Sequence, residues 1–536
     1  MDMPTRLKKH SMKQVSAFIL IISLAMVALA QEITVFNHNY PYEYYYTCNS
    51  MQIKNDTFLL SGAIKYDNQE CGQWLQGQHV ASINSQGELV EVNSFSRCNW
   101  GLYTGKGGFT LSSENDYVFA GQEFSEISPE NNLFFLKLNE FGDTILLNRY
   151  YEDTLAKRCW SMNKTQDNGY ILVGSIDSTR SEYYSPDIVR GQIMLTKLNS
   201  LGEQIWNNSY IIINDVGLGT WQSGRNVIET WDKGYIVSGL AYNFSTYLFS
   251  SFIMKVDSLG NYKWKQFFSA APYDAPNIMD IIATKDSCYV ICGAKNYGEV
   301  FGGLYPYDGW IYKFDTNGMS KWQKTYREHH PEPQDYRDTI YCYFYSMCEL
   351  PDGRIAVTGR ARKKVGPSNT TPFLYLLTSE GDSIFSKHFC QYPENHPDWV
   401  NEAYPSKIVQ TDNGGFAIAG WGVYTEWIEE EQHWEQPERI FLIKTDSLGN
   451  DIYTSISPPL QSPEDKFTVY PNPAAGWVTV TAPAEGVLEL YGSTGSVALK
   501  ANVSKGEKRI ALTGLMPGMY LARLKNTGFT AKIIVQ

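Results

Sequence analysis

The stretch "VDSLGNYKW" at residues 256–264 decides the fold. It predicts the end of a strand, a tight turn and the start of the returning strand. Gly260 stands where such a turn needs a positive φ, and Trp264 begins the return. The phrase recurs as "LNSLGEQIW" (198–206), "FDTNGMSKW" (314–322) and "TDSLGNDIY" (445–453). A phrase that returns at wide, similar spacing predicts a repeat architecture.

A second phrase, a short apolar run closed by glycine, precedes each copy of the first. Such runs are too short for helices and rich in β-branched and aromatic residues, so they predict strands buried on both faces. Their closing glycines lie 53 to 66 residues apart. The seven copies are "FLLSG" (58–62), "YVFAG" (117–121), "YILVG" (170–174), "YIVSG" (235–239), "YVICG" (289–293), "IAVTG" (355–359) and "FAIAG" (416–420).

Each pair of phrases therefore predicts a four-stranded antiparallel meander: a strand, the glycine-closed run, the strand before the "SLG" turn, and the returning strand. Seven such units over residues 31–457 predict a seven-bladed β-propeller in an all-β protein. We expect the recurring aromatics Trp206, Trp264 and Trp322 to fill the wedge between outer strands of adjacent blades. The glycines of the repeated turns are Gly87, Gly142, Gly202, Gly260, Gly318, Gly381 and Gly449.

Two segments compete to close the ring. "QEITVFNHNY" (31–40) is similar to the fourth-strand text "GEQIWNNSY" (202–210), and it would pair with the last blade. "NDIYTSIS" (450–457) would fill the same position. If residues 31–50 instead begin a further partial blade, the ring has eight blades.

The first thirty residues predict a secretory signal peptide rather than part of the fold. Basic residues precede the apolar run "VSAFILIISLAMVALA" (15–30), which ends in the cleavage pattern Ala28-Leu29-Ala30. We expect cleavage near Ala30. No second long apolar run follows, so we expect no membrane span in the mature chain.

The charge of the chain argues against nucleic acid as a partner. The formal net charge is −12, and removal of the leader, which carries +3, leaves −15. Such a surface repels phosphate backbones. An aromatic content of 14% with only 19% charged residues favours an extracellular all-β protein.

The nine cysteines are an odd number, so at least one is free or pairs between chains. Cys288 and Cys292 stand four apart in a predicted strand, which is too far to bridge. Cys342 with Cys348, and Cys71 with Cys98, are candidate disulfides. Burial as small apolar residues is the equal alternative.

The C-terminal text differs from the repeats. A proline-rich linker (458–466) precedes residues 467–536, where alternating apolar residues and frequent turns predict a small Ig-like β-sandwich. The segment carries the residues Tyr470, Pro471, Asn472, Pro473, Gly518, Tyr520 and Lys532. In these residues it resembles the type A C-terminal sorting domain of the Bacteroidetes type IX secretion system. The resemblance implies export through the type IX machinery to the cell surface or the medium.

The repeats also resemble, over about residues 50–457, the roughly sixty-residue propeller repeats of large bacterial secreted proteins. Their likeness to quinoprotein-type blades is looser. They differ from the sialidase Asp-box, because Asp257 and Gly260 are one residue too far apart.

Two segments carry residues that suit a ligand or metal. "TEWIEEEQHWEQPER" (425–439) places carboxylates beside indoles, which suits a sugar or calcium ion. "REHHPEPQDYRDTIYCYFY" (327–345) holds His329, His330, Glu332 and Asp335 as potential metal ligands. We favour a solvated acidic loop for the first and no metal site for the second. The sequence thus predicts no metal, no cofactor and no catalytic residue.

Three function classes follow. A binding or adhesion module for a glycan or protein ligand comes first, because the aromatic segments 37–46, 301–310 and 391–404 offer broad amphipathic faces. A glycan-acting hydrolase or lyase with a propeller funnel is the alternative. A structural surface component is the third. No acid–base pair at a recognisable spacing accompanies the aromatics, so we expect binding rather than catalysis.

Overall fold

The computed structural model describes two segments of the chain, 35–451 and 468–535, with gaps. The gaps fall at 41–44, 69–72, 96–100, 106, 125–131, 151–155, 178–190, 214–219, 244–247, 269–275, 297–306, 327–341, 363–369, 390–399, 425, 429–432, 436–437, 471–473, 483–484, 492–496 and 525–529.

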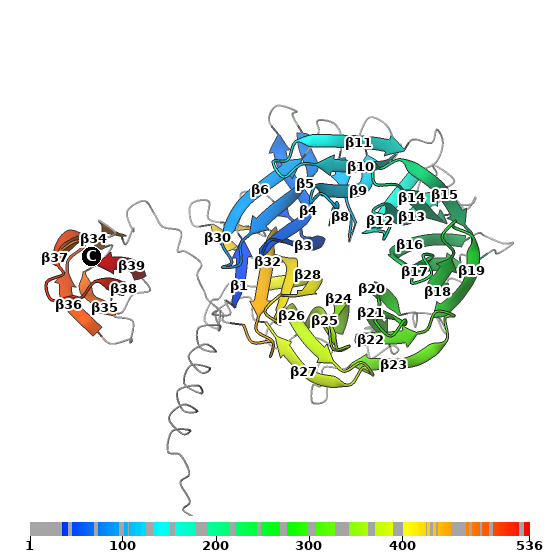
Figure 1. The fold of residues 1–536 in the computed structure, drawn as a ribbon. Coiled ribbons are helices and arrows are strands. Elements are labelled where there is room, and N and C mark those ends of the chain that lie inside the picture. Colours follow the sequence, from blue (N-terminus) through cyan, green and yellow to red (C-terminus); the bar gives the residue numbers. More distant parts are fainter. Residues whose placement is uncertain are drawn as a thin grey trace, which may run out of the picture. The chain divides into compact units, whose positions relative to one another are not determined.

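The described residues fold into β-structure in two compact units, Met1–Thr454 and Ser455–Gln536. In the first unit, four- and five-stranded antiparallel sheets stand around a ring in chain order, running from blue to yellow in Figure 1. This is the β-propeller that the repeats predict. Across its described residues the unit contains seven such sheets, which we number as blades 1 to 7.

Within a blade, the strands follow the predicted order from the innermost first strand to the outer fourth strand. Blade 1 is β2 (Tyr45–Tyr46) and β3 (Ser50–Lys54), then β4 (Thr57–Asn68), β5 (Gln73–Ile83) and β6 (Leu89–Phe95). Blade 2 is β7 (Gly101–Tyr103) and β8 (Phe109–Leu111), then β9 (Tyr117–Phe124), β10 (Asn132–Leu138) and β11 (Thr144–Tyr150). Blade 3 is β12 (Ala156–Lys164), β13 (Tyr170–Asp177), β14 (Gly191–Leu198) and β15 (Gln204–Tyr210). Blade 4 is β16 (Thr220–Glu229), β17 (Tyr235–Asn243), β18 (Leu248–Val256) and β19 (Tyr262–Phe268).

The remaining blades follow the same plan, with one addition in the last. Blade 5 is β20 (Asn277–Ala283), β21 (Tyr289–Asn296), β22 (Tyr307–Phe314) and β23 (Ser320–Tyr326). Blade 6 is β24 (Cys342–Glu349), β25 (Ile355–Arg362), β26 (Thr370–Leu377) and β27 (Ser383–His388). Blade 7 is β28 (Val400–Gln410), β29 (Phe416–Tyr424), β32 (Glu438–Thr445) and β1 (Phe36–Tyr40), and the hairpin β30 (Glu426–Ile428) and β31 (His433–Glu435) lies between β29 and β32.

In blades 3 to 7, the glycine that closes the second strand faces a bulge in the first strand. In blade 3 the register shifts between Cys159 and Ser161, directly opposite Gly174. A Cβ on Gly174 would lie 1.7 Å from the Arg158 carbonyl oxygen. The other blades show comparable backbone approaches, so only glycine admits the bulged strand at this point.

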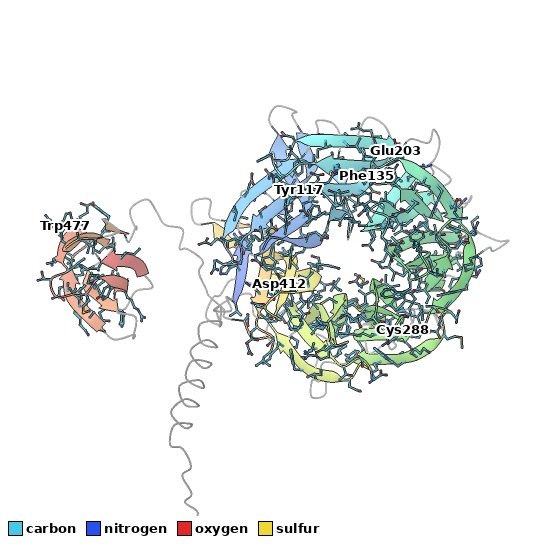
Figure 2. All side chains as sticks on the ribbon, in the orientation of Figure 1. Tyr117, Phe135, Glu203, Cys288, Asp412 and Trp477 are labelled. Carbon is cyan, nitrogen blue, oxygen red and sulfur yellow. The ribbon has the colours of Figure 1, made fainter. Side chains whose placement is uncertain are left out.

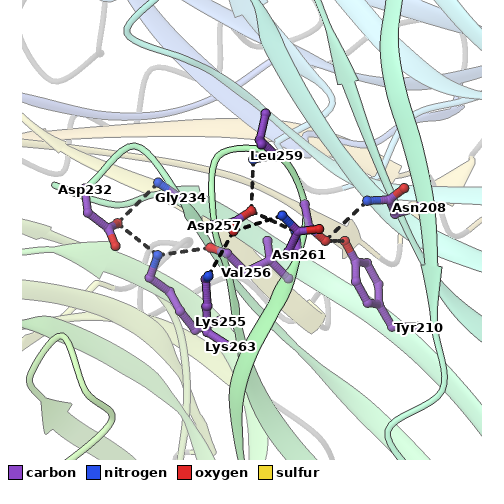
Figure 3. Close-up of polar contacts among 11 residues, drawn as sticks. Asn208, Tyr210, Asp232, Gly234, Lys255, Val256, Asp257, Leu259, Asn261 and Lys263 are labelled. Atoms are coloured by element: carbon purple, nitrogen blue, oxygen red, sulfur yellow. Dashed lines mark hydrogen bonds and ion pairs between the residues drawn. The ribbon is translucent and has the colours of Figure 1, made fainter.

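The repeated turn is organised by its first residue. The Asp257 carboxylate accepts hydrogen bonds from the backbone N–H groups of Leu259 (3.0 Å) and Asn261 (2.8 Å), as Figure 3 shows. These bonds, the Asn261 backbone bond foremost, hold the pKa of Asp257 well below its usual range. Gly260 takes a φ of +81°, and the other six turn glycines also have positive φ, between 71° and 85°.

The recurring aromatic packs on the turn glycine of the next blade. A Cβ on Gly318 would lie 3.1 Å from the Trp264 ring, and a Cβ on Gly381 would lie 2.8 Å from Trp322. This confirms that the tryptophans fill the wedge between outer strands of adjacent blades.

Four residues after the recurring aromatic, a tyrosine hydroxyl donates a hydrogen bond to the turn glycine of the next blade, an interaction that we call the clamp. The Tyr210 hydroxyl donates to the Gly260 carbonyl oxygen at 2.6 Å, and Asn208 donates to it at 3.2 Å (Figure 3). Tyr326 makes the same bond to Gly381 at 2.6 Å. Tyr150 also donates to the Gly202 carbonyl oxygen.

The N-terminal strand closes the ring. β1 pairs antiparallel with β32, so that Phe36 faces Lys444 and Tyr40 faces Ile440. The Tyr40 hydroxyl then donates to the Gly87 carbonyl oxygen at 2.9 Å, which is the same clamp that joins blades adjacent in sequence. Among the described residues, Phe36–Tyr40 therefore provides the closing strand, while 31–34 and 452–457 lie outside them.

Buried side chains fill the space between neighbouring sheets (Figure 2). Phe135 of blade 2 lies 5.0 Å from Tyr170 of blade 3, centroid to centroid, and both are fully buried. Third-strand lysines lie at the edge of this core. Lys255 is paired with Asp232 at 2.9 Å and Lys197 with Asp167 at 2.9 Å.

The Cys342–Cys348 disulfide prediction is wrong. No disulfide joins the two residues, and both lie in the single extended strand β24, where six residues span about 20 Å. Cys288 and Cys292 likewise form no disulfide with each other, as their spacing predicts. Cys71 and Cys98 lie outside the described residues.

The second unit is a small sandwich of two sheets around its own core, which contains Val478, Val480, Leu488 and Leu490. It fits the predicted Ig-like architecture. One sheet is β33 (Thr468–Tyr470), β34 (Trp477–Ala482) and β37 (Gly506–Ala511), and the other is β36 (Val497–Val503), β35 (Gly486–Tyr491), β38 (Gly518–Leu524) and β39 (Thr530–Val535).

In neither unit do the described residues include a helix of the length and apolarity that crossing a membrane requires.

Candidate functional site

The first strands of the propeller enclose a cavity of about 450 Å³. Six blades line it, through β3, β8, β12, β16, β20 and β28. Its volume lies within the range of about 300–1,000 Å³ that small-molecule sites occupy. Polar side chains dominate several of these strands: Asn49, Gln52, Asn163, Lys164, Asn226 and Glu229.

Hydrogen bonds from strand to strand hold the wall of this cavity together. Ser50 Oγ donates to the Phe109 carbonyl at 3.2 Å, and Asn163 Nδ2 donates to the Val227 carbonyl. Asp280 accepts bonds from Ser346 Oγ (2.9 Å) and from the next backbone N–H, that of Met347 (3.1 Å). Since each bond joins first strands of neighbouring blades, the wall is pre-formed.

The two carboxylates of the wall, Asp280 and Glu229, accept hydrogen bonds from neighbouring blades. Asp280 accepts a third hydrogen bond from the Ile281 backbone N–H at 3.0 Å and is 9% exposed. Glu229 accepts from the Gln166 backbone N–H at 2.7 Å. Asp280 thus joins the first strands of blades 5 and 6, and Glu229 joins blades 3 and 4 through one hydrogen bond.

An aromatic–guanidinium pair lies next to the cavity wall, at the bulges of two adjacent first strands. Trp160 stands at the bulge of β12 and Arg225 at the bulge of β16. The Arg225 guanidinium carbon lies 3.9 Å from the Trp160 ring centroid. The residues that follow them, Ser161 and Asn226, line the cavity.

A second stack lies across blades 6 and 7. Arg360 stands over Tyr404 at 4.2 Å, and Tyr404 stacks on Trp421 at 4.5 Å. Glu402 pairs with the same guanidinium at 3.3 Å. Arg360 therefore already has a counter-ion, whereas Arg225 has no carboxylate partner among the described residues.

The aromatic segments proposed from sequence are described only in part, and their rings have different roles. Tyr40 is the ring-closing clamp. Tyr307 packs on Tyr343 at 4.8 Å, and Tyr404 belongs to the stack with Arg360. Tyr40 is structural, Tyr307 of β22 packs against the first strand β24, and Tyr404 lies in the first strand β28.

The two segments weighed as metal or sugar sites fall largely outside the described residues. Of 425–439, the backbone of the β30–β31 hairpin is described, with Trp427 opposite Trp434. Residues 327–341, with all four potential metal ligands, are not described. Among the residues that are, no group of three or more His, Cys, Asp or Glu could hold a metal ion.

Four of the predicted sorting residues, Tyr470, Gly518, Tyr520 and Lys532, lie in the sandwich strands. Tyr470 ends β33, is 43% exposed and donates from its hydroxyl to Glu507 at 2.7 Å. Tyr520 donates to the Met516 carbonyl oxygen at 2.8 Å, and Gly518 begins the same strand, β38. The Lys532 backbone pairs with Leu521. Pro471, Asn472 and Pro473 are not among the described residues.

Sequence reasoning missed Trp160 and Arg225. They can be found only by their position in the strand. When the first strands are aligned on their bulges, the bulged residues form one column of the alignment, which contains Trp160, Arg225, Met279, Tyr345 and Ser406. A first strand has no fixed phrase of its own, so this column becomes visible only once the bulge is known.

Residues 468–536 match the family model of the secretion system C-terminal sorting domain. This segment is a type IX sorting domain. It indicates that the protein is exported, to the cell surface or beyond it, and handled by the type IX machinery. The match covers the second unit and leaves the propeller unassigned. A comparison with curated proteins gave no match.

Solved structures share the propeller fold at low identity. The chain is similar to the β-propeller domain of the Trilobed protease from Pyrococcus furiosus, with 9% identity, a TM-score of 0.37 and coverage of 74% of this chain and 96% of that chain. It is similar to a PL25 ulvan lyase, with 9% identity, a TM-score of 0.45 and coverage of 76% and 96%. An α-L-arabinanase from Penicillium chrysogenum gives 11% identity, a TM-score of 0.36 and coverage of 63% and 92%. These likenesses concern the fold alone.

Proposed function

We propose that the protein is a binding or adhesion module, exported by the type IX machinery of a Bacteroidetes cell, that takes a glycan or protein ligand at its central channel. Residues 1–30 serve as the signal peptide, with cleavage near Ala30. Residues 467–536 supply the second export signal.

The observation that carries this proposal is the cavity of about 450 Å³ walled by first strands from six blades. Its amide side chains Asn49, Asn163 and Asn226 each donate one hydrogen bond within the propeller and carry a second N–H and an acceptor oxygen, which suits a ligand rich in hydroxyl or peptide groups. A pre-formed wall costs little ordering on binding.

The hydrogen bonds that the wall carboxylates accept favour binding over catalysis. Acid–base hydrolysis of a glycosidic bond uses two carboxyl groups free to face the substrate. Asp280 and Glu229 instead accept backbone and hydroxyl hydrogen bonds that hold the wall. A glycan-acting hydrolase or lyase is the alternative function.

The binding proposal is tested by filling the channel. A Gln52→Trp variant places a large ring in the cavity, and Gln204→Trp on the exposed outer strand of blade 3 is the matched control. On a glycan array and in a pull-down with envelope proteins, we expect Gln52→Trp to lose at least about tenfold in affinity while the control binds as wild type. Equal binding by both variants would place the ligand elsewhere. Glycan turnover abolished by a single Asp or Glu substitution would replace binding by the enzyme alternative.

The export route has its own test. Deletion of residues 467–536 should leave the folded propeller in the periplasm of the native host, as measured by cell fractionation. Arrival of the truncated chain in the medium or on the surface would contradict the route.

A further inference from the structure

The flat face of the Arg225 guanidinium packs on aromatic rings, whereas its Nε–H edge has no hydrogen-bond partner among the described residues. Its guanidinium carbon lies 3.9 Å from the Trp160 ring centroid and 5.9 Å from that of Trp221. Stacking of this kind uses the flat face of the guanidinium and leaves its N–H groups pointing outward in the plane. That planar fork matches the oxygens of a carboxylate or sulfate.

Two donors in this stack lack an acceptor. Arg225 Nε and Trp160 Nε1 are buried, and neither has a hydrogen-bond partner among the described residues. Arg149 shows the contrast, because Glu123 takes its guanidinium at 2.7 and 3.1 Å. Arg360 likewise has Glu402. A buried donor without an acceptor is costly, so an acceptor from outside the chain would bind favourably.

The local charge also favours an anion. Burial lowers the pKa of Arg225, and the nearby Arg158 lowers it further, while the phenol of Tyr103 raises it. Among the described residues, no carboxylate contributes to this pKa shift. A bound anion would relieve both the desolvation of Arg225 and its repulsion from Arg158.

We propose that the Trp160–Arg225 stack is the anion-recognition subsite of the channel and takes the carboxylate or sulfate group of an acidic saccharide. The inference rests on the proposed function and gives its ligand a chemical class.

A saccharide fits better than an acidic peptide because of what adjoins the stack. Ser161 and Asn226, the next residues along each strand, line the cavity, and Asn163 follows two residues later. Hydroxyl and amide side chains beside a guanidinium suit a ring that carries both hydroxyls and one anionic group.

The test uses the full mature chain and four probes: an oligogalacturonate, a sulfated oligosaccharide, a neutral galactan oligosaccharide and a poly-glutamate peptide. Arg225→Gln removes the charge and the fork, and Arg225→Lys keeps the charge alone. Lys233→Asn, in the exposed β16–β17 turn where φ is +61°, is the matched control for net charge. Affinity is measured by calorimetry at two salt concentrations, with thermal unfolding as the check on folding.

We expect one or both acidic saccharides to bind more tightly than the neutral one. Arg225→Gln should then lose about 10- to 100-fold and Arg225→Lys less, while Lys233→Asn binds as wild type. Retention of acidic-saccharide affinity by Arg225→Gln, with channel binding intact, would overturn the subsite and leave the proposed function standing. Capture of poly-glutamate but no saccharide would overturn the ligand class. If no probe binds and Gln52→Trp changes nothing, the proposed function fails with it.

Discussion

The hydroxyl of Tyr210 shows how single atoms join one blade to the next. It bonds the Gly260 carbonyl at 2.6 Å, yet blade 4 has Phe268 at the corresponding position, where no hydroxyl exists. The ring therefore mixes junctions that carry this clamp with junctions that lack it, such as that of blades 4 and 5, where Gln266 Nε2 donates to the Tyr312 hydroxyl at 3.0 Å instead. The clamp adds stability at particular junctions and is not a requirement of the fold.

Replacement of Tyr210 by Phe should lower the free energy of unfolding by about 1 kcal/mol, because one partly buried hydrogen bond to a carbonyl is lost. Urea unfolding measures the change. Tyr262→Phe in the neighbouring hairpin is the control, since Tyr262 is 48% exposed. Equal effects in both variants would show that the clamp contributes nothing of its own.

Gly260 combines a positive φ with a close neighbour, and the two effects can be separated. A Cβ there would meet Asn208 Nδ2 at 2.3 Å, whereas Gly414 has a similar φ of +80° and nothing within 4 Å. We expect Gly414→Ala to cost on the order of 1 kcal/mol and Gly260→Ala measurably more. Similar midpoints of urea unfolding for the two would assign the whole cost to φ.

His79 makes stability depend on pH. It is fully buried in β5, and burial lowers its pKa to about 3. Between that value and the unfolded pKa near 6.5, the unfolded chain binds the extra proton, so stability falls as the pH falls. Between pH 7 and 5, wild type should lose about 2 kcal/mol more than His79→Gln in urea unfolding. The exposed His388→Gln should follow wild type, and parallel curves for all three proteins would contradict the assignment.

At the scale of elements, removal of strand β1 tests how the ring is closed. A chain lacking residues 31–40 leaves the β32 edge unpaired beside the Gly87 turn. We expect a lower unfolding temperature and concentration-dependent association through that edge, measured by calorimetry and size-exclusion chromatography.

Addition of the peptide QEITVFNHNY in trans should restore both properties. The same peptide with Tyr40 and His38 replaced by Ala should restore them less, because it lacks both contacts to the Gly87 carbonyl. A truncated chain as stable and monomeric as wild type would show that β1 does not close the ring.

The strands that sequence predicts best are those with a repeated phrase. The "SLG" turn and the glycine-closed run reveal three of the four strands in a blade, because turn geometry and burial on both faces restrict their residues. The closing role of residues 31–40 is also visible as a similarity to 202–210. First strands escape this reasoning, since a bulge displaces their alternation and the cavity permits varied side chains.

The candidate site is correspondingly the part that sequence predicts least. Trp160 and Arg225 are 65 positions apart, and each is unremarkable within its own strand. Only the registers of two bulges bring them together. The aromatic loops that composition favours contribute Tyr404 to a stack, but Tyr40 proved structural.

At the scale of the molecule, the two units have separate cores. We expect residues 31–454 alone to keep the ligand affinity and the propeller unfolding transition of the mature chain. The sandwich should unfold in a transition of its own under calorimetry. A shift of the propeller transition on removal of residues 467–536 would show that the units stabilise each other.

Closure of the ring by β1 also has a consequence for the order in which parts of the chain fold. His38 pairs with Leu442, so about 400 residues must be in place before the first strand meets its partner. The loop-closure entropy of such a separation is about 5 kcal/mol, far above that of a local hairpin. We therefore expect the pairing of β1 with β32 to be a late event of folding, preceded by an open arc in which both end blades are exposed. Pulse-labelled hydrogen exchange should find the amides of Phe36–Tyr40 among the last to gain protection, and early protection there would reverse that order.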